Sequence, residues 1–263
     1  EAARRIGQII ARNFVQDGTT LQYGIGQVPE AVTDAILAKG VMDLGIHTEL
    51  FADAMQRLVE AGVVTNRHTF IHVNCAMSSI FLSSDQEGYD WLDYNSSVQS
   101  RPCDYTNSVL NIAREPNMVA INGAIGVDLH GNIWADSLQA RRIYSGVGGQ
   151  SDFLRGAALS PGGVPIIALR STTEKGISKI VEKCPEGITT TAIAADQVVI
   201  VTEHGAFDPW GLSFSERVVA IAHLAEPETR HQLLKQIYDS PVYHHPAQAL
   251  KDRVPKGIIP LNF

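Results

Sequence analysis

One carboxylate, Glu49, occupies the position in this sequence that is best suited to chemistry. It follows the short apolar run of residues 41–46 and precedes a segment, residues 51–63, whose apolar side chains recur at helical spacing. The pattern predicts that Glu49 lies where a strand gives way to a helix, which is the usual place for a site in an open α/β sheet. A helix start would keep the carboxylate ionised and able to act as a nucleophile. Acidic residues also stabilise a first helical turn without further function, so position alone leaves both interpretations open.

A glycine turn precedes this segment. Gly24-Ile25-Gly26 follows a predicted strand at 19–23 and is followed by Pro29 and a predicted helix at 30–38. Glycines let a backbone approach a phosphate closely, and a helix N-terminus favours anions. The turn lacks the third glycine of a dinucleotide fingerprint and the Gly-Lys-Ser/Thr of a P-loop. It is therefore equally consistent with a tight connection between strand and helix.

A second glycine turn lies further along the chain and contains Gly146, Gly148 and Gly149. Three glycines in four residues leave backbone where side chains would interfere. Such a turn can present two N–H groups to one oxygen and so form an oxyanion hole. It can also be a loop that passes close to a neighbouring strand.

Strands and helices alternate along the rest of the sequence, which indicates an α/β fold with an open, largely parallel sheet flanked by helices. We expect one domain, residues 1–263, with a peripheral tail at 241–263. The predicted helices are 2–15, 154–159, 213–222 and 229–238; the predicted strands are 69–73, 78–82, 118–122, 164–169 and 197–202, with a strand, turn and strand over 123–133.

Composition excludes several classes of protein. The net charge is −7 and no run of Lys and Arg is present, so we expect no nucleic-acid partner. No apolar stretch is long enough to span a bilayer, so we expect no membrane partner. Three widely spaced cysteines form neither a disulfide framework nor a zinc pattern, which favours a reducing, cytoplasmic location. We expect no metal; a pair at His244 and His245 lacks nearby carboxylate or cysteine ligands.

Several segments together resemble the acetyl-CoA hydrolase/transferase family of class I CoA-transferases, which includes 4-hydroxybutyrate and itaconate CoA-transferases. The similarity covers most of residues 21–223, with the G-V-G-G-Q-x-D-F piece the most specific. The matching segments are LQYGIGQVPEAV (21–32), DLGIHTELFADAMQRLVEAGVVTN (43–66), VDLHGNIWADS (127–137), YSGVGGQSDFLRGAALSPGG (144–163) and VVIVTEHG (198–205).

The resemblance implies that the chain moves CoA between a short-chain acyl-CoA and a carboxylic acid. Glu49 would be the nucleophile and form a glutamyl-CoA thioester, with Gly148 and Gly149 against the thioester as donors. CoA would be a co-substrate and no cofactor would be bound permanently. The residues implied to contact CoA are Gly24, Ile25, Gly26, Gln27, Val28, Gly146 and Lys175.

The sequence departs from the family in three respects. The resemblance implies an N-terminal domain that this chain lacks, so that domain would be missing or belong to a separate chain. Gly126 stands where an acidic residue is expected, and His204 where the family often has Tyr. The resemblance further implies a homo-oligomer. An acyl-CoA hydrolase on the same scaffold and a non-catalytic CoA-binding subunit remain alternative functions.

Overall fold

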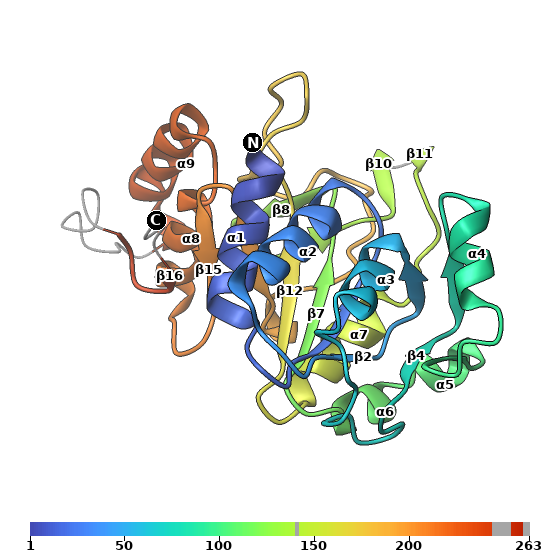
Figure 1. Cartoon of the computed structure of the whole chain (residues 1–263). Helices are drawn as coiled ribbons and strands as arrows, with labels where there is room; N and C mark the ends of the chain where they lie inside the picture. The colour runs from blue at the N-terminus through green and yellow to red at the C-terminus, as the bar shows by residue number, and fades with distance from the viewer. Residues whose placement is uncertain (140–141, 244–253, 260–263) are drawn as a thin grey trace. The chain divides into compact units, whose positions relative to one another are not determined.

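The computed structural model describes residues 1–139, 142–243 and 254–259 (Figure 1). Contacts among these residues divide the chain into two units. Unit 1 holds residues 3–122 and 149–166, and unit 2 holds residues 123–148 and those from 167 onward; residue 1 joins unit 1 and residue 2 joins unit 2. Whether the chain acts as one domain stays a prediction.

Unit 1 contains the helices α1 to α7 and three complete strands of the main sheet. Its elements are α1 (Ala2–Phe14), β1 (Thr20–Tyr23), α2 (Gln27–Lys39), β2 (Gly45–Ile46), β3 (Leu50–Ala52), α3 (Asp53–Glu60), β4 (Ala76–Ser78), β5 (Ile80–Leu82), α4 (Gln86–Leu92), β6 (Val98–Ser100), α5 (Cys103–Thr106), α6 (Val109–Arg114), β7 (Met118–Asn122) and α7 (Gln150–Leu159).

The strand β1 is the centre of unit 1. It is parallel to β2, with Leu21 opposite Ile46, and parallel to β7, with Leu21 opposite Val119. All four of its residues are buried, as expected for a strand between two neighbours. Because the three strands are parallel, the segments that follow them leave the sheet at the same edge.

Helix α7 is packed against α6 and β7 within unit 1 (Figure 1). Its residue Gly156 allows this close approach, because an added Cβ would lie 2.4 Å from the Ile112 side chain. Phe153 of the same helix is fully buried in a cluster with Met118 and Ala120 of β7. The sheet and α6 together fix the position of α7 and of its N-terminus.

Unit 2 contains shorter strands and two C-terminal helices. Helix α8 begins with a capping box, in which the Ser213 hydroxyl accepts from Glu216 N and the Glu216 carboxylate accepts from Ser213 N. The elements are β8 (Gly126–Asp128), β9 (Ile133–Trp134), β10 (Ser137–Gln139), β11 (Arg142–Ile143), β13 (Ile180–Val181), η1 (Ala194–Asp196), β14 (Val199–Thr202), β15 (Gly205–Phe207), α8 (Phe214–His223), α9 (Pro227–Asp239), η2 (Pro241–Tyr243) and β16 (Ile258–Ile259).

The main sheet has seven strands in the order β16-β15-β14-β12-β7-β1-β2, and the boundary between the units falls within β12 (Val164–Ala168). Strand β15 is antiparallel to β14 and β16. The sheet is otherwise mostly parallel and is flanked by helices, so the predicted fold class is confirmed. The predicted strand at 118–122 coincides with β7, and the predicted strand–turn–strand at 123–133 forms the antiparallel pair β8 and β9.

Three predictions of local structure are wrong. The helix expected over residues 51–63 begins only at Asp53, because Leu50–Ala52 forms β3 and pairs with β5. Residues 69–73 are not a strand; their backbone turns, and Phe70 N and Ile71 N donate to the Glu115 carboxylate. The predicted strand at 78–82 is two strands, β4 and β5, that meet at Ser79.

The C-terminal tail contains Ile258–Ile259, which forms β16 and pairs with Ala206 and Phe207 of β15; that the tail is peripheral stays a prediction. Within unit 2 this adds an edge strand to the sheet. An alternating sequence pattern of only two residues is too short to reveal such a strand. The pair His244 and His245 lies outside the described residues.

Candidate active site

The backbone of Glu49 is fixed from two sides. It follows β2, and His47, two residues before Glu49, extends the pairing with β1 because His47 N donates to Leu21 O at 3.2 Å. Its own carbonyl accepts from Ser79 N at 2.9 Å and Ile80 N at 2.8 Å. Glu49 therefore lies between two strands, β2 and β3, and the prediction that it precedes a helix directly is wrong.

The Glu49 carboxylate is half-buried and accepts two hydrogen bonds, both on Oε2. Asn107 Nδ2 donates at 2.9 Å and Gly149 N donates at 2.8 Å. Among the described residues, no donor reaches Oε1. One oxygen is therefore held in place while the other keeps its lone pairs available for attack.

A helix N-terminus does reach Glu49, but it belongs to another helix than expected. Gly149 is the N-cap of α7 and donates to Oε2, whereas the first turn of α3 contains Asp53 instead of Glu49. Free N–H groups and the helix dipole favour a negative charge at this end of α7. The helix N-terminus expected at Glu49 is therefore present, but it is that of α7 and not that of α3.

Position 149 requires glycine because there is no room for a side chain, and not because of its backbone conformation. Its φ is −72°, which any residue can adopt. An added Cβ would lie 2.1 Å from Glu49 Oε2 and 2.5 Å from Asn107 Nδ2. Only the absence of a side chain lets the N–H of this residue reach the carboxylate.

Asn107 donates to the Glu49 carboxylate, and the sequence analysis did not select it. Its Oδ1 accepts from Thr106 Oγ1 at 2.9 Å, and Thr106 Oγ1 also shares a hydrogen bond with Ser79 Oγ. Since Ser79 N in turn donates to the Glu49 carbonyl, these four residues form a closed ring of hydrogen bonds. The ring fixes the amide so that Nδ2 faces Glu49. No local motif marks this asparagine, which lies between the short helices α5 and α6.

A second carboxyl group, Asp152, lies in the first turn of α7. Burial raises the pKa of Asp152, and the negative charge of Glu49 raises it further, while Arg155 acts in the opposite direction. The electrostatic coupling to Glu49 places Asp152 in the surroundings of the site. Sequence reasoning did not select it.

The turn of residues 24–28 leaves the sheet beside Glu49. Gly24 directly follows β1 and Glu49 follows β2, and these strands are parallel neighbours. Gly26 has φ +118° and is the N-cap of α2, while the Ile25 side chain is exposed. The arrangement brings Gly24, Ile25, Gly26, Gln27 and Val28 to the sheet edge that carries Glu49; their contact with CoA stays a prediction.

Three predicted site residues belong to unit 2, and their roles stay predictions. Gly146 has open space where a Cβ would be added, unlike Gly149. Gly148 is exposed and directly precedes Gly149 in the chain. Lys175 is exposed in a turn closed by Thr173 N to Ile177 O at 2.8 Å.

Packing within unit 2 explains why glycine occupies position 126. An added Cβ at Gly126 would lie 2.2 Å from the Trp134 ring, and Trp134 is almost fully buried. The two residues are opposite each other in the β8–β9 pair. The large indole therefore takes the space that an acidic side chain at 126 would need.

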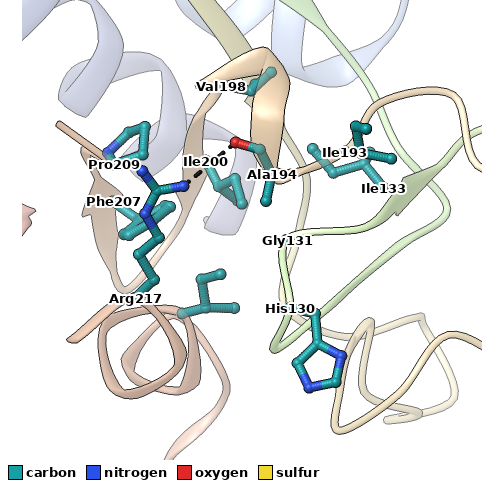
Figure 2. Close-up of a pocket in the computed structure, with 11 residues that line it drawn as sticks. His130, Gly131, Ile133, Ile193, Ala194, Val198, Ile200, Phe207, Pro209 and Arg217 are labelled. Carbon is teal, nitrogen blue, oxygen red and sulfur yellow. Dashed lines mark hydrogen bonds between the residues drawn. The ribbon is translucent and has the colours of Figure 1, made fainter. Parts of the chain in front are cut away.

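Unit 2 also contains a small cavity of about 20 Å³, which has room for about one water molecule. Figure 2 shows its mostly apolar lining, with Arg217 at one side and His130 at another. The guanidinium of Arg217 donates to Ala194 O and Leu212 O and to Gln197 Oε1. With its charged group engaged and so little space, this cavity does not fit an acyl-CoA.

Within residues 1–139, 142–243 and 254–259, no group of three or more His, Cys, Asp or Glu side chains is arranged to hold a metal ion. In the same part of the chain, no helix combines the length and the apolar character needed to cross a membrane.

Comparison with known proteins identifies relatives across most of the chain. Residues 85–237 match the family model described as the acetyl-CoA hydrolase/transferase C-terminal domain. The succinyl-CoA:acetate/propanoyl-CoA:succinate CoA transferase of Fasciola hepatica is 40% identical over 243 residues, covering 91% of this chain and 50% of that protein. The 4-hydroxybutyrate coenzyme A transferase of Clostridium kluyveri is 37% identical over 237 residues, covering 90% of this chain and 54% of that protein.

Solved structures give the same result. RipA from Yersinia pestis has a TM-score of 0.83 and 36% identity, covering 90% of this chain and 52% of that one. The chain thus spans about half the length of the relatives it matches. Asn107 and Gly149 lie inside the segment that matches the family model, and Glu49 lies before it. Because that segment is more than half of the chain, this protein belongs to the acetyl-CoA hydrolase/transferase family.

Proposed function

We propose that this chain transfers CoA between a short-chain acyl-CoA and a carboxylic acid, with Glu49 as the nucleophile. The observation that carries the proposal is the asymmetric hydrogen bonding of the Glu49 carboxylate, whose Oε2 accepts from Asn107 Nδ2 and Gly149 N. The family membership and the transferase names of the relatives support the same reaction class.

In the first step, Glu49 Oε1 attacks the carbonyl carbon of the acyl-CoA. A new C–O bond forms, the C–S bond breaks, and the CoA thiolate leaves with the electron pair. The product is a mixed anhydride between the acyl group and Glu49. A thioester is electrophilic enough for a carboxylate to attack it, and the thiolate is a good leaving group.

In the second step, the thiolate attacks the glutamyl carbonyl carbon, and Oε2 becomes the oxyanion of the tetrahedral intermediate. The two N–H groups that already point at Oε2 would stabilise that charge. The C–O bond to the acyl carboxylate then breaks, releasing the first acid and leaving a Glu49–CoA thioester. A second acid reverses these steps. In this scheme Asn107, rather than Gly148, is the partner of Gly149 as a donor.

CoA itself would be held at the turn of residues 24–28 of unit 1, and contacts of CoA with Gly146 and with Lys175 stay separate predictions for unit 2. The backbone of Gly24 and Gly26 is open to an incoming group, since an added Cβ at either position meets no atom within 4 Å. CoA acts here as a co-substrate. A homo-oligomer belongs to this proposal as the expected assembly.

Hydrolysis on the same scaffold is the second candidate, because the family's description covers both hydrolases and transferases. Water that reaches the glutamyl thioester would release free CoA, so exclusion of water separates the two activities. Ping-pong exchange between two acids supports transfer. Release of free thiol without an acceptor acid supports hydrolysis.

The test is intact-protein mass spectrometry after mixing with acetyl-CoA, followed by peptide mapping. We expect a mass increase of CoA less one water on the peptide that contains Glu49. Binding of CoA should be measured separately by calorimetry. An adduct on another residue, or CoA binding without any adduct or turnover, would contradict the proposed mechanism; the latter would favour a non-catalytic CoA-binding subunit.

A further inference from the structure

The site contains a buried histidine that the proposed chemistry does not use. His47 lies two residues before Glu49, and its side chain is 1% exposed. Its Nε2 lies 2.8 Å from Thr106 O. A carbonyl oxygen only accepts, so Nε2 carries a hydrogen and donates it to Thr106. The next residue along from that carbonyl is Asn107, the side-chain donor to Glu49.

The same imidazole contacts the element that supplies the second donor. Its ring meets the Phe153 ring edge-on, with the ring centroids 6.1 Å apart. Phe153 is one turn into α7, and its N–H donates to Gly149 O at 2.9 Å. His47 therefore touches both segments whose N–H groups hold Glu49 Oε2.

On its other side the ring faces a fixed carboxylate. His47 Nδ1 lies 3.5 Å from Glu115 Oε1, and the Glu115 side chain is 2% exposed. Glu115 in turn accepts from Phe70 N at 2.7 Å and Ile71 N at 3.3 Å. The imidazole is thus enclosed by three neighbours, Glu115, the Thr106 carbonyl and Phe153, and has no room to turn.

We propose that His47 is a positioning residue for this reaction. It sets the Thr106–Asn107 peptide and the start of α7 at the distance from each other at which both N–H groups meet one oxygen of Glu49. This inference rests on the proposed function for its kinetic consequences, but the geometry it describes can be measured without turnover. His47 does not touch the reacting atoms and acts only through Asn107 and Gly149.

The hydrogen bond to Thr106 and the ring contact distinguish this role from that of an ordinary core residue. An apolar side chain of similar volume would fill the space and still leave the Thr106 carbonyl without its donor. That carbonyl would then be free to rotate, and Asn107 would move with it. Displacements of about 1 Å in a positioned group can reduce turnover by about 100-fold.

The test compares two amide substitutions. In His47→Gln the amide nitrogen can reach the position of Nε2 and donate to Thr106 O, whereas in His47→Asn it is too short and corresponds to Nδ1. We expect kcat within about threefold of wild type for His47→Gln and a loss of about 10- to 100-fold for His47→Asn, with KM changed little in either. Equal losses in the two variants, or a change confined to KM, would overturn the proposal.

A readout without turnover separates this inference from the proposed function. The Gly149 amide and the Asn107 side-chain NH₂ are followed by NMR with hydrogen exchange in the CoA-free protein. In His47→Asn both signals should shift and exchange faster, and in His47→Gln both should stay near wild type. If wild type shows no CoA exchange, the proposed function fails, while the NMR result still decides the role of His47.

Two further variants complete the design. Glu115→Gln can still accept from Phe70 N and can donate to His47 Nδ1, so we expect kcat within about threefold; a larger loss would mean that the Glu115 charge takes part in the chemistry and would overturn a pure positioning role. His223→Asn, a half-buried histidine of unit 2, controls for the loss of any histidine. If His47→Asn does not fold, His47→Gln tests the proposal: it must keep the Gly149 and Asn107 NMR signals and a kcat within about threefold of wild type.

Discussion

Two carboxylates, Asp128 and Glu49, differ in how hydrogen bonds are distributed over their two oxygens. Asp128 in unit 2 is fully buried and uses both oxygens: Oδ1 accepts from His130 N and Asn132 N, and Oδ2 accepts from Asn132 Nδ2 and Cys184 N. Glu49 in unit 1 is half-buried and, within the described part of the chain, accepts on Oε2 only. The first arrangement closes a turn between β8 and β9, and the second leaves one oxygen available.

The difference shows that the number of donors matters less than their distribution. Four N–H groups on two oxygens consume the lone pairs that a nucleophile needs. Two N–H groups on one oxygen orient the carboxylate and, in the proposed mechanism, later stabilise the oxyanion on that same atom.

The largest effect is expected on removing the free oxygen itself. Glu49→Ala should reduce CoA exchange by roughly 10⁴-fold or more, because no other nucleophile is proposed, while CoA still binds. Exchange is measured with labelled acid, and binding by calorimetry. The matched variant Asp128→Asn should keep exchange but lower the free energy of unfolding by about 1–3 kcal/mol, because the turn loses acceptors. Retained exchange in Glu49→Ala would remove the basis of the mechanism.

A smaller effect is expected when the donors are displaced and the nucleophile is kept. In Gly149→Ala the new methyl group would lie 2.1 Å from Glu49 Oε2, so the two would have to move apart. We expect kcat to fall by about 10²- to 10³-fold, the scale of losing an oxyanion donor. Gly123→Ala, where an added Cβ meets no atom within 4 Å, serves as the control. Equal rates in the two variants would show that Gly149 is not a donor in the reaction.

Removing the side-chain donor alone should have an effect of similar or slightly smaller size. Asn107→Ala is expected to lower kcat by about 10²-fold, since one donor to Oε2 is lost and Gly149 remains. The exposed Asn13→Ala in α1 should leave kcat unchanged. Stopped-flow measurement of adduct formation and breakdown shows which step slows; the proposal requires that the step in which Oε2 carries the charge is slowed.

The packing in unit 2 gives a test of stability instead of rate. Gly126→Ala places a methyl group against the Trp134 ring, and we expect a loss of about 1–3 kcal/mol in the free energy of unfolding from overpacking. Urea unfolding measures it. Adding Trp134→Leu should restore part of this loss. No recovery in the double variant would mean that the two residues are not coupled.

The smallest effect concerns pH. Burial, together with the nearby positive charge of Arg230, lowers the pKa of His223 to about 4. The neutral form is therefore favoured in the folded state, so its stability contribution is complete above the ordinary histidine pKa of about 6.5 and is lost as pH falls towards 4. Urea unfolding at pH 7 and pH 5 should show a smaller decrease for His223→Gln than for wild type. An equal decrease in the free energy of unfolding in both proteins would mean that other groups cause the acid sensitivity.

The sequence was sufficient for the fold class and for most buried elements. Residues such as Met118–Asn122 and Val164–Ala168 are continuous apolar runs, which is how a strand buried on both faces reads. The sequence also selected Glu49, Gly149 and the turn at Gly24 as candidates for one site. In the structure Gly149 N donates to Glu49, and the turn at Gly24 follows β1, the parallel neighbour of the strand that precedes Glu49.

The donors and supports of Glu49 could not be predicted, for physical reasons. Asn107 is 58 residues away in the chain, and its orientation depends on Thr106 and Ser79, so no local spacing encodes it. The short strand β3 was concealed because Phe51 fits helical spacing equally well, and only its pairing with Phe81 decides the outcome. Long-range pairings of this kind override local propensity.

The contact between Gly126 and Trp134 also has an evolutionary consequence. A lineage that carries this pair could not acquire an acidic residue at position 126 in one step, because the new side chain would force a buried ring out of place. The smaller residue at 134 would have to arise first, at the expense of a cavity. The order of two substitutions is thus constrained, and any influence of position 126 on substrate choice is inherited together with its partner in β9.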